Sequence, residues 1–401
     1  MKQNKKLVIW FALLAVLTAC FVTCLVLLLT LPAPGDKPVG PANLAEALES
    51  QQSAVLESGK TFRLEIPQEL MGEDVTFTSS DEKVIKVDAT GLVTATGKGM
   101  AFVTVSDSDE TVRCGFIVDG KGSLIDVTKL SAKEVFSNLK LHATTEITGM
   151  AVDAKNQAVY FSQQYGTGSY LPLNSDIMVS KVEWKDNAWV LSGWMRFTGS
   201  GKGSICVDND GQTTRLWLES GGDYIGYGKS ISLVEWEDGG YCLDAYGQTF
   251  RPQGIDGSMT VTADPQNNMV LVYDRSAKCY RVYDRSEMLA GEEEPAYVHA
   301  FACKANQTPA AGVDDSQGRY NASIRGYALH DGYVYQLSGS STIYLSVFDL
   351  NGNLQYCHRI TDYPELDYRM PASVSVVDGK VYVAVASGNS EYVLANVWTF
   401  E

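Results

Sequence analysis

Hydrophobic and polar residues alternate with a period of two over much of the chain. Between residues 59 and 119, runs such as FRLEI, KVIKVD and GLVTATG carry an apolar side chain at about every second position. This alternation is typical of strands with one buried face, and each run is closed by Gly, Asp or Ser, which favour turns. We therefore expect a compact sandwich of short strands over residues 55–119.

The same segment, VTFTSSDEKVIKVDATGLVTATGKGMAFVTV, resembles the group 2 bacterial immunoglobulin-like (Ig-like) domain. The resemblance rests on SSD at 79–81, on GLVT at 91–94, and on Gly97 and Gly99 before the next strand. Phe77 stands where the family usually has a Trp. The resemblance implies a spacer or adhesive module of the kind found in bacterial and phage surface proteins.

A continuous apolar segment precedes this region. Residues 7–31 read LVIWFALLAVLTACFVTCLVLLLTL and contain no charged side chain. A helix of that length rises about 37 Å, which is enough to cross a bilayer, and the run exceeds the apolar core of a cleaved signal peptide. Because Lys2, Lys5 and Lys6 come first, we expect residues 1–6 to be cytoplasmic and the rest of the chain to lie outside a bacterial cell.

A lipoprotein is the alternative to this uncleaved membrane anchor. LTAC at 17–20 resembles a lipobox, in which Cys20 would become the lipidated N-terminus. The apolar run continues past Cys20, where a lipoprotein normally turns polar, so we favour the anchor. Residues 32–54 begin rich in Pro and Gly and are expected to form an extended spacer, with a short helix open over 43–52.

Two elements recur five times between residue 127 and the end of the chain. The first is a strand, an Asp-led turn and a strand with an aromatic residue, and the second is a strand with a common Val. Repeats of about 50 residues with three or four strands each are typical of propeller blades. The markers are Asp153, Asp208, Asp264, Asp331 and Asp378; Tyr160, Trp217, Tyr273, Tyr335 and Tyr382; and Val182, Val234, Val282, Val347 and Val397.

We therefore predict an all-β chain in which an N-terminal transmembrane helix and a small Ig-like sandwich precede a five-bladed β-propeller over residues 127–401. A strand near residues 135–142 is expected to complete the fifth blade and so remove two exposed sheet edges.

One stretch of the repeats, MRFTGSGKGSICVDNDGQTTRLWLES, resembles the five-bladed propellers of helveticin-J-like bacteriocins, a teichoic-acid-operon protein of bacilli and some phage receptor-binding proteins. Lys202 stands where that group tends to have a His. The resemblance implies recognition of a cell-surface polymer, in particular a glycan.

Charge and composition narrow the function. The net charge of −16 disfavours nucleic acid. With four His residues and no CxxC, HExxH or GxSxG motif, we expect no metal centre, no cofactor and no established catalytic signature. The DNDG sequence at 208–211 leaves Ca²⁺ open, but it lacks the Glu of an EF-hand loop and is favoured as a hairpin turn. A Cys279–Cys303 disulfide stays open; the other ectodomain cysteines are expected to be free thiols.

The candidate ligand-binding residues stand just before the inner strands of the predicted propeller, where they would surround one mouth of its channel. Three cations against one carboxylate favour binding of an anionic or polyhydroxylated ligand over glycoside hydrolysis, as do two aromatic side chains that could stack on sugars. The residues are Lys202, Asp256, Arg325, Arg369, Tyr327 and Tyr368.

We expect a membrane-anchored, extracellular protein for adhesion or carbohydrate binding. A propeller-fold glycoside hydrolase or lyase, or a bacteriocin-like surface-active protein, is the alternative. The two classes are separated by whether Asp256, Asp153 or Glu146 meets another carboxylate at the channel mouth.

Overall fold

The computed structural model describes residues 41–72, 74–120, 124–143, 145–165, 176–197, 204–209, 213–220, 230–242, 247–255, 257–303, 324–339, 342–361, 370–388 and 393–401. The predicted membrane anchor over 7–31, the alternative lipidation site Cys20 and the spacer up to residue 40 lie outside these ranges. Within them, no helix combines the length and the apolar character needed to cross a membrane.

The N-terminal part is a β-sandwich. One sheet has the order β1 (Ser53–Glu57), β7 (Thr111–Asp119), β6 (Gly99–Ser106), β3 (Thr76–Ser79), and the other has the order β2 (Thr61–Arg63), β5 (Leu92–Ala95), β4 (Ile85–Val87). The alternating apolar residues of both sheets meet in one core that includes Val93, Val103 and Phe116. The predicted sandwich is therefore confirmed.

The sandwich begins earlier than the predicted residue 55. Helix α2 (Leu44–Leu48) is capped by Asn43, whose side chain accepts a hydrogen bond from the Glu46 backbone N–H at 2.9 Å, and the 3₁₀ helix η1 (Glu49–Gln51) follows. Leu44 and Leu48 are buried in the sandwich core. The end of the predicted spacer thus belongs to the folded domain, because its two leucines cover one end of that core.

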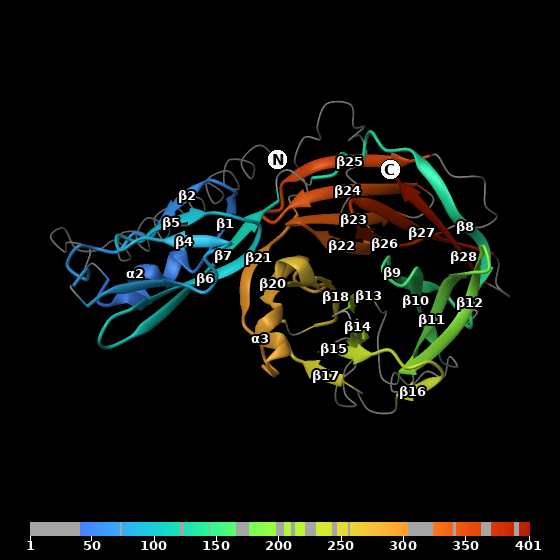
Figure 1. Cartoon of the computed structure of the whole chain (residues 1–401), viewed down its shortest axis with the longest axis horizontal. Coiled ribbons are helices and arrows are strands. Elements are labelled where there is room, and N and C mark those ends of the chain that lie inside the picture. The colour runs from blue at the N-terminus through green and yellow to red at the C-terminus, as the bar shows by residue number, and fades with distance from the viewer. Residues whose placement is uncertain are drawn as a thin grey trace, which may run out of the picture.

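The rest of the chain forms five sheets arranged around a common centre (Figure 1). The first sheet contains β9 (Ile147–Asp153), β10 (Ala158–Tyr165), β11 (Asp176–Lys185), β12 (Ala188–Phe197) and the short β16 (Gly240–Cys242), and the second contains β13 (Ile205–Asn209), β14 (Thr214–Ser220), β15 (Ser230–Glu235) and β17 (Gly247–Phe250). The third contains β18 (Met259–Asp264), β19 (Met269–Asp274), β20 (Cys279–Asp284) and β21 (Tyr297–Phe301), and the fourth contains β22 (Ile324–His330), β23 (Tyr333–Gly339), β24 (Ile343–Asp349) and β25 (Leu354–Ile360). The fifth contains β26 (Met370–Val377), β27 (Lys380–Gly388), β28 (Val393–Phe400) and β8 (Ala132–Lys140). We refer to these as sheets I to V, and to the whole as the ring.

The first strands of the five sheets are innermost and contact one another in cyclic order, β9, β13, β18, β22, β26 and again β9. Each pair of neighbouring sheets encloses its own apolar cluster, so packing rather than hydrogen bonding joins one sheet to the next. The recurring aromatic residues lie in or against these clusters; Trp217 and Tyr335, for example, are fully buried. The sequence markers therefore identify the sheet-to-sheet contacts.

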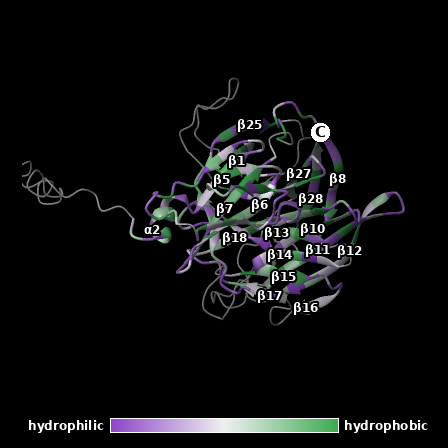
Figure 2. Cartoon of the chain, turned by 60° about the vertical axis from the view of Figure 1, so that its left-hand side comes forward, coloured by the Kyte–Doolittle hydropathy of each residue, from purple (hydrophilic) through white to green (hydrophobic). Residues whose placement is uncertain are grey.

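Strand β8 completes sheet V by pairing antiparallel with β28, as the sequence predicted. Its residues are mostly exposed or half-buried, and it is coloured hydrophilic over much of its length (Figure 2). Phe136 is buried in the cluster between sheets V and I, and Val135 and Leu139 pack against the same cluster while half-buried. The last sheet thus contains both an early and a late segment of the chain.

Candidate ligand-binding end of the ring

The inner strands β13, β18 and β22 run in the same direction. Tyr327 of β22 contacts Thr260 of β18, and Asp331 contacts Asp264, four residues further along in both. The Ser204 hydroxyl accepts a hydrogen bond from Val261 N–H at 2.7 Å, and Cys206 contacts Ala263 N–H two residues further along both strands. We call the end where the inner strands begin the leading end and the end where they finish the trailing end. Of the predicted ligand-binding residues that the structure describes, Arg325 lies at the leading end.

Arg325 is the second residue of β22 and lies at the leading end beside the loop that precedes β9. Its Nε–H donates to the Gly339 carbonyl at 3.1 Å, and its Nη1 donates to the carboxylate of Glu146 at 3.3 Å. The two side chains are 27% and 49% exposed. Arg325 and Glu146 come from sheets IV and I, which are not neighbours, so their ion pair lies across the leading end.

The other predicted site residues divide into two groups. Lys202, Asp256, Tyr368 and Arg369 lie outside the described residues. Tyr327 is described and does not face a ligand: its ring is buried between sheets III and IV, and its hydroxyl donates to the Thr260 carbonyl at 2.5 Å. Its ring is therefore not available to stack on a sugar.

The recurring Asp residues that the sequence analysis identified, one in each sheet, lie at the trailing end. They are Asp153, Asp208, Asp264, Asp331 and Asp378. Four of the five are buried, and Asp378 is exposed. The two Asp-Gly turns have positive φ at both residues, 50° and 82° at Asp331–Gly332 and 51° and 71° at Asp378–Gly379, which is the hairpin conformation that the sequence predicted. The buried carboxylates join neighbouring sheets.

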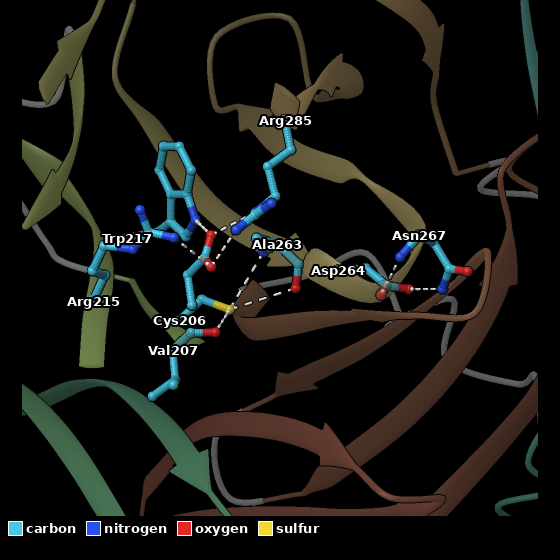
Figure 3. Close-up of polar contacts among 9 residues, drawn as sticks. Cys206, Val207, Arg215, Trp217, Ala263, Asp264, Asn267 and Arg285 are labelled. Carbon is cyan, nitrogen blue, oxygen red and sulfur yellow. Dashed lines mark hydrogen bonds and ion pairs between the residues drawn. The ribbon is translucent and has the colours of Figure 1, made fainter. Parts of the chain in front are cut away.

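Asp208 shows how such a carboxylate joins two sheets. Arg285, at the start of helix α3 (Arg285–Leu289) of sheet III, donates from Nε and Nη2 to its two oxygens at 2.7 and 2.6 Å. Trp217 Nε1–H donates to the same carboxylate at 2.8 Å, and Arg215 approaches it at 3.5 Å (Figure 3). A carboxylate surrounded by these donors is unsuited to Ca²⁺, and no metal-binding group of acidic, His or Cys residues occurs among the described residues.

Asp264 and Asp331 form a second link, between sheets III and IV. Asn267 Nδ2 donates to both carboxylates, at 2.6 and 2.9 Å, and the Asp331 backbone N–H donates to Asp264 at 2.8 Å. Burial raises the pKa of Asp264 above its usual range. Lys98 of the sandwich donates to Asp331 at 2.6 Å, so one cation from the sandwich faces this buried acidic pair.

The sandwich is docked against the ring beside sheets III and IV, with α2 at the end far from the ring (Figure 1). Met100 and Ile117 of the sandwich are buried in the same apolar cluster as residues of β19 to β24. Arg113 pairs with Glu287 at 2.5 Å, and Ser53 is hydrogen-bonded to His299 at 3.2 Å. The Ig-like domain is therefore packed onto the ring rather than strung before it as a separate unit.

Cys114, Cys206, Cys279, Cys303 and Cys357 are free thiols. Cys279 pairs in register with Asp274 and lies near that residue and Arg281, whereas Cys303 belongs to the cluster with Tyr280 on the side of sheet IV. The two thiols lie on different sides of sheet III, so the disulfide that the sequence left open does not form here. Burial raises the pKa of Cys303 to about 12, which keeps it protonated.

Sequence reasoning located the acidic turns but not their partners. Arg285 and Lys98 have no repeating position, and each reaches its aspartate only because two sheets or two domains meet. Asn267 follows Asp264 by three residues, as Asn156 follows Asp153, so its bond to Asp264 is local and only its bond to Asp331 joins two sheets. The available signals were the recurring Asp after an apolar strand and the Asn that stands three residues after Asp153 and Asp264.

Comparison with solved structures gives a likeness of fold. The tail fibre of Staphylococcus aureus phage P68 is similar at 14% identity and a TM-score of 0.53, over 69% of this chain and 54% of that one. The chain thus spans about half the length of that protein. An exo-beta-1,3-galactanase from Clostridium thermocellum has 13% identity and a TM-score of 0.38, over 67% of this chain and 62% of the enzyme.

A GH43_1 enzyme from Xanthomonas citri, complexed with xylotriose, has 10% identity and a TM-score of 0.37, over 66% of this chain and 89% of the enzyme. At these scores neither enzyme supports a conclusion about this chain. No curated protein matches the sequence. Residues 50–114 match the family model of the bacterial Ig-like domain, group 2, and the sandwich is therefore identified as a domain of that family.

Proposed function

We propose that this chain is a membrane-anchored, extracellular binding protein whose ring is a five-bladed β-propeller that recognises a cell-surface glycan or partner protein. Residues 7–31 supply the anchor in this proposal, and Lys2, Lys5 and Lys6 orient it. The cyclic contact of five inner strands, the apolar cluster between each pair of sheets and the β8–β28 pairing support the propeller. The resemblance of the repeats to helveticin-J-like and phage receptor-binding propellers favours binding as their role.

The Glu146–Arg325 pair carries the choice of binding over hydrolysis. A glycosidase places two carboxyl groups roughly 5–10 Å apart on either side of the scissile bond. Glu146 instead faces a guanidinium at 3.3 Å, and Asp153 lies at the trailing end, where Asn156 and Asn209 donate to it. The carboxylates that the described residues place near the inner strands thus have roles in binding or in structure.

The first test measures binding of the full chain to purified bacterial cell walls and to a panel of immobilised polysaccharides. We expect saturable binding to at least one of them. Arg325→Ala should weaken it by about tenfold or more, because a hydrogen bond to a charged group contributes about 1.5–3 kcal/mol. Arg63→Ala is the control, since Arg63 is an exposed arginine on β2 of the sandwich, away from the leading end.

A melting curve of each variant separates a loss of binding from a loss of folding. Release of reducing sugar from any bound polysaccharide would contradict the proposal in favour of the enzymatic alternative. Absence of binding to every wall and polysaccharide by the folded, unsubstituted chain would reject it outright.

A further inference from the structure

The two ends of the ring differ in what they leave accessible. At the trailing end, Lys98 and the backbone N–H of Gly120 bond to Asp331, and Arg113 reaches Glu287 beside the end of β20. The docked sandwich therefore occupies part of the trailing end at sheets III and IV. No described contact of the sandwich reaches Arg325 or Glu146 at the leading end.

The trailing end is also committed to structure by its polar groups. The oxygens of Asp208 accept from Arg285 and Trp217, and those of Asp264 accept from Asn267 and the Asp331 backbone. These carboxylates are at most 5% exposed. Because these buried oxygens already accept hydrogen bonds from neighbouring sheets, they are poorly placed to bind a ligand.

The leading end keeps polar groups that are both oriented and accessible. The bond from Arg325 Nε–H to the Gly339 carbonyl holds the guanidinium in place. An arginine carries five N–H donors, and the described contacts of Arg325 use one on Nε and one on Nη1. Glu146, half exposed beside it, contributes acceptors. A fixed donor next to an acceptor matches two neighbouring hydroxyl groups of a sugar, each of which donates and accepts.

Charge indicates which class of sugar fits. Among the described residues of the leading end, Glu146 compensates the charge of Arg325 at 3.3 Å, and the chain as a whole carries −16. An anionic polymer would be repelled at long range and would meet a carboxylate on arrival, whereas an uncharged polysaccharide would not.

From these observations we infer that the leading end, centred on Arg325 and Glu146, is the ligand-binding face of the ring, and that its ligand is an uncharged, polyhydroxylated glycan. The inference rests on the proposed binding function and adds to it the face and the ligand class. The docked sandwich and the acidic links between sheets leave the trailing end a structural face.

The test compares a bulky label at each end of the full chain. Ala277→Cys places a thiol in the exposed β19–β20 turn at the leading end, and Lys155→Cys places one in the exposed β9–β10 turn at the trailing end. Each is reacted with a maleimide-linked polyethylene glycol, and the unsubstituted chain treated in the same way controls for the native thiols. Trp184→Ala removes a 43% exposed Trp at the trailing end, whose ring offers an alternative surface for stacking on a sugar.

The probes are galactan, glucan and mannan as uncharged polymers and poly(glycerol phosphate) and polygalacturonate as anionic ones. We expect binding to an uncharged polymer that falls at least about tenfold when residue 277 is labelled and changes less than about twofold when residue 155 is labelled or Trp184 is removed. Loss of binding on labelling residue 155, or in Trp184→Ala, overturns the assignment of the face while the proposed function stands. Preference for an anionic polymer overturns the ligand class. No binding by the unlabelled chain rejects the proposed function itself, and this inference with it.

Discussion

At the scale of single residues, the buried polar groups of this protein act as links between parts that are distant in sequence. Asp208 receives donors from two sheets, and Asp331 receives them from sheet III and from the sandwich. A buried carboxylate is stable only when donors surround it, so each link also requires that its two parts stay in register.

His299 is a residue of this kind at the contact between sandwich and ring. Its Nε2–H donates to the Leu350 carbonyl at 2.9 Å, which leaves Nδ1 to accept from the Ser53 hydroxyl. Burial lowers the pKa of His299 below its ordinary value. The folded protein therefore favours the neutral imidazole more than the unfolded chain does.

This shift predicts that the protein is less stable in acid. The unfolded chain takes up a proton near pH 6.5, the ordinary His value, while folded His299 resists it, so the unfolded state binds more protons below that pH. The contribution of His299 is complete above about pH 6.5 and is lost as the pH falls towards and below the lowered folded pKa. Urea unfolding between pH 7.5 and 5 should show a smaller free energy at the acid end.

His299→Gln serves as the control, because it keeps hydrogen-bonding groups but does not titrate in this range. The pH dependence of its unfolding free energy should be weaker than that of the unsubstituted chain. Equal slopes for the two proteins would mean that His299 does not sense pH, and that other groups, such as His142, carry the acid sensitivity.

At the scale of elements, strand β7 of the sandwich packs closely against strand β21 of the ring. Gly115 of β7 lies against Val298 of β21 so closely that a Cβ at Gly115 would stand 2.2 Å from Val298 Cγ1. On its other side, Gly115 N–H donates to Gln52 at 2.7 Å, which fixes the strand in its place. The glycine thus allows two strands of different domains to approach.

Gly115→Ala should destabilise the docked sandwich by about 1–3 kcal/mol, as overpacking typically does. The compensating change is Val298→Ala, which removes the methyl groups in the way. We expect the double variant to recover part of the loss in a thermal or urea unfolding experiment, and Val298→Ala alone to have the smaller effect. Strictly additive effects of the two changes would show that these strands do not touch.

At the scale of the whole molecule, the ring and the Ig-like domain share one apolar cluster. Met100 and Ile117 are 5% and 0% exposed, and they owe this burial to residues such as Leu271, Phe301 and Leu350 of the ring. Separation of the two parts would expose apolar surface on both, at a cost of about 25 cal/mol per Å². The sandwich therefore positions the ring instead of serving as a flexible spacer.

The shared cluster predicts that the two parts unfold together. In hydrogen exchange followed by mass spectrometry at increasing urea, peptides from β6 and β7 should lose protection at the same concentration as peptides from β20 and β24. Met100→Ala should lower that common midpoint. Earlier exchange of the β6 and β7 peptides alone would indicate that the sandwich opens independently and that the docking is weak.

Much of the architecture was predictable from local pattern. Strands, Asp-Gly hairpins, the Ig-like segment and the return of an early strand to the last sheet follow from alternation, turn residues and repeats, because these depend on neighbours in sequence. The sequence also placed Arg325 near the start of an inner strand, and in the structure it is the second residue of β22.

Other features depended on which surfaces meet in space. Tyr327 was predicted as an exposed platform but is buried, because sheet III covers it and offers a carbonyl to its hydroxyl. The pairing of Glu146 with Arg325, the placing of Cys279 and Cys303 on different sides of a sheet, and the docking of Lys98 onto Asp331 likewise join residues far apart in the chain. Sequence periodicity reports which face of a strand is apolar, and only the packed molecule decides what that face touches.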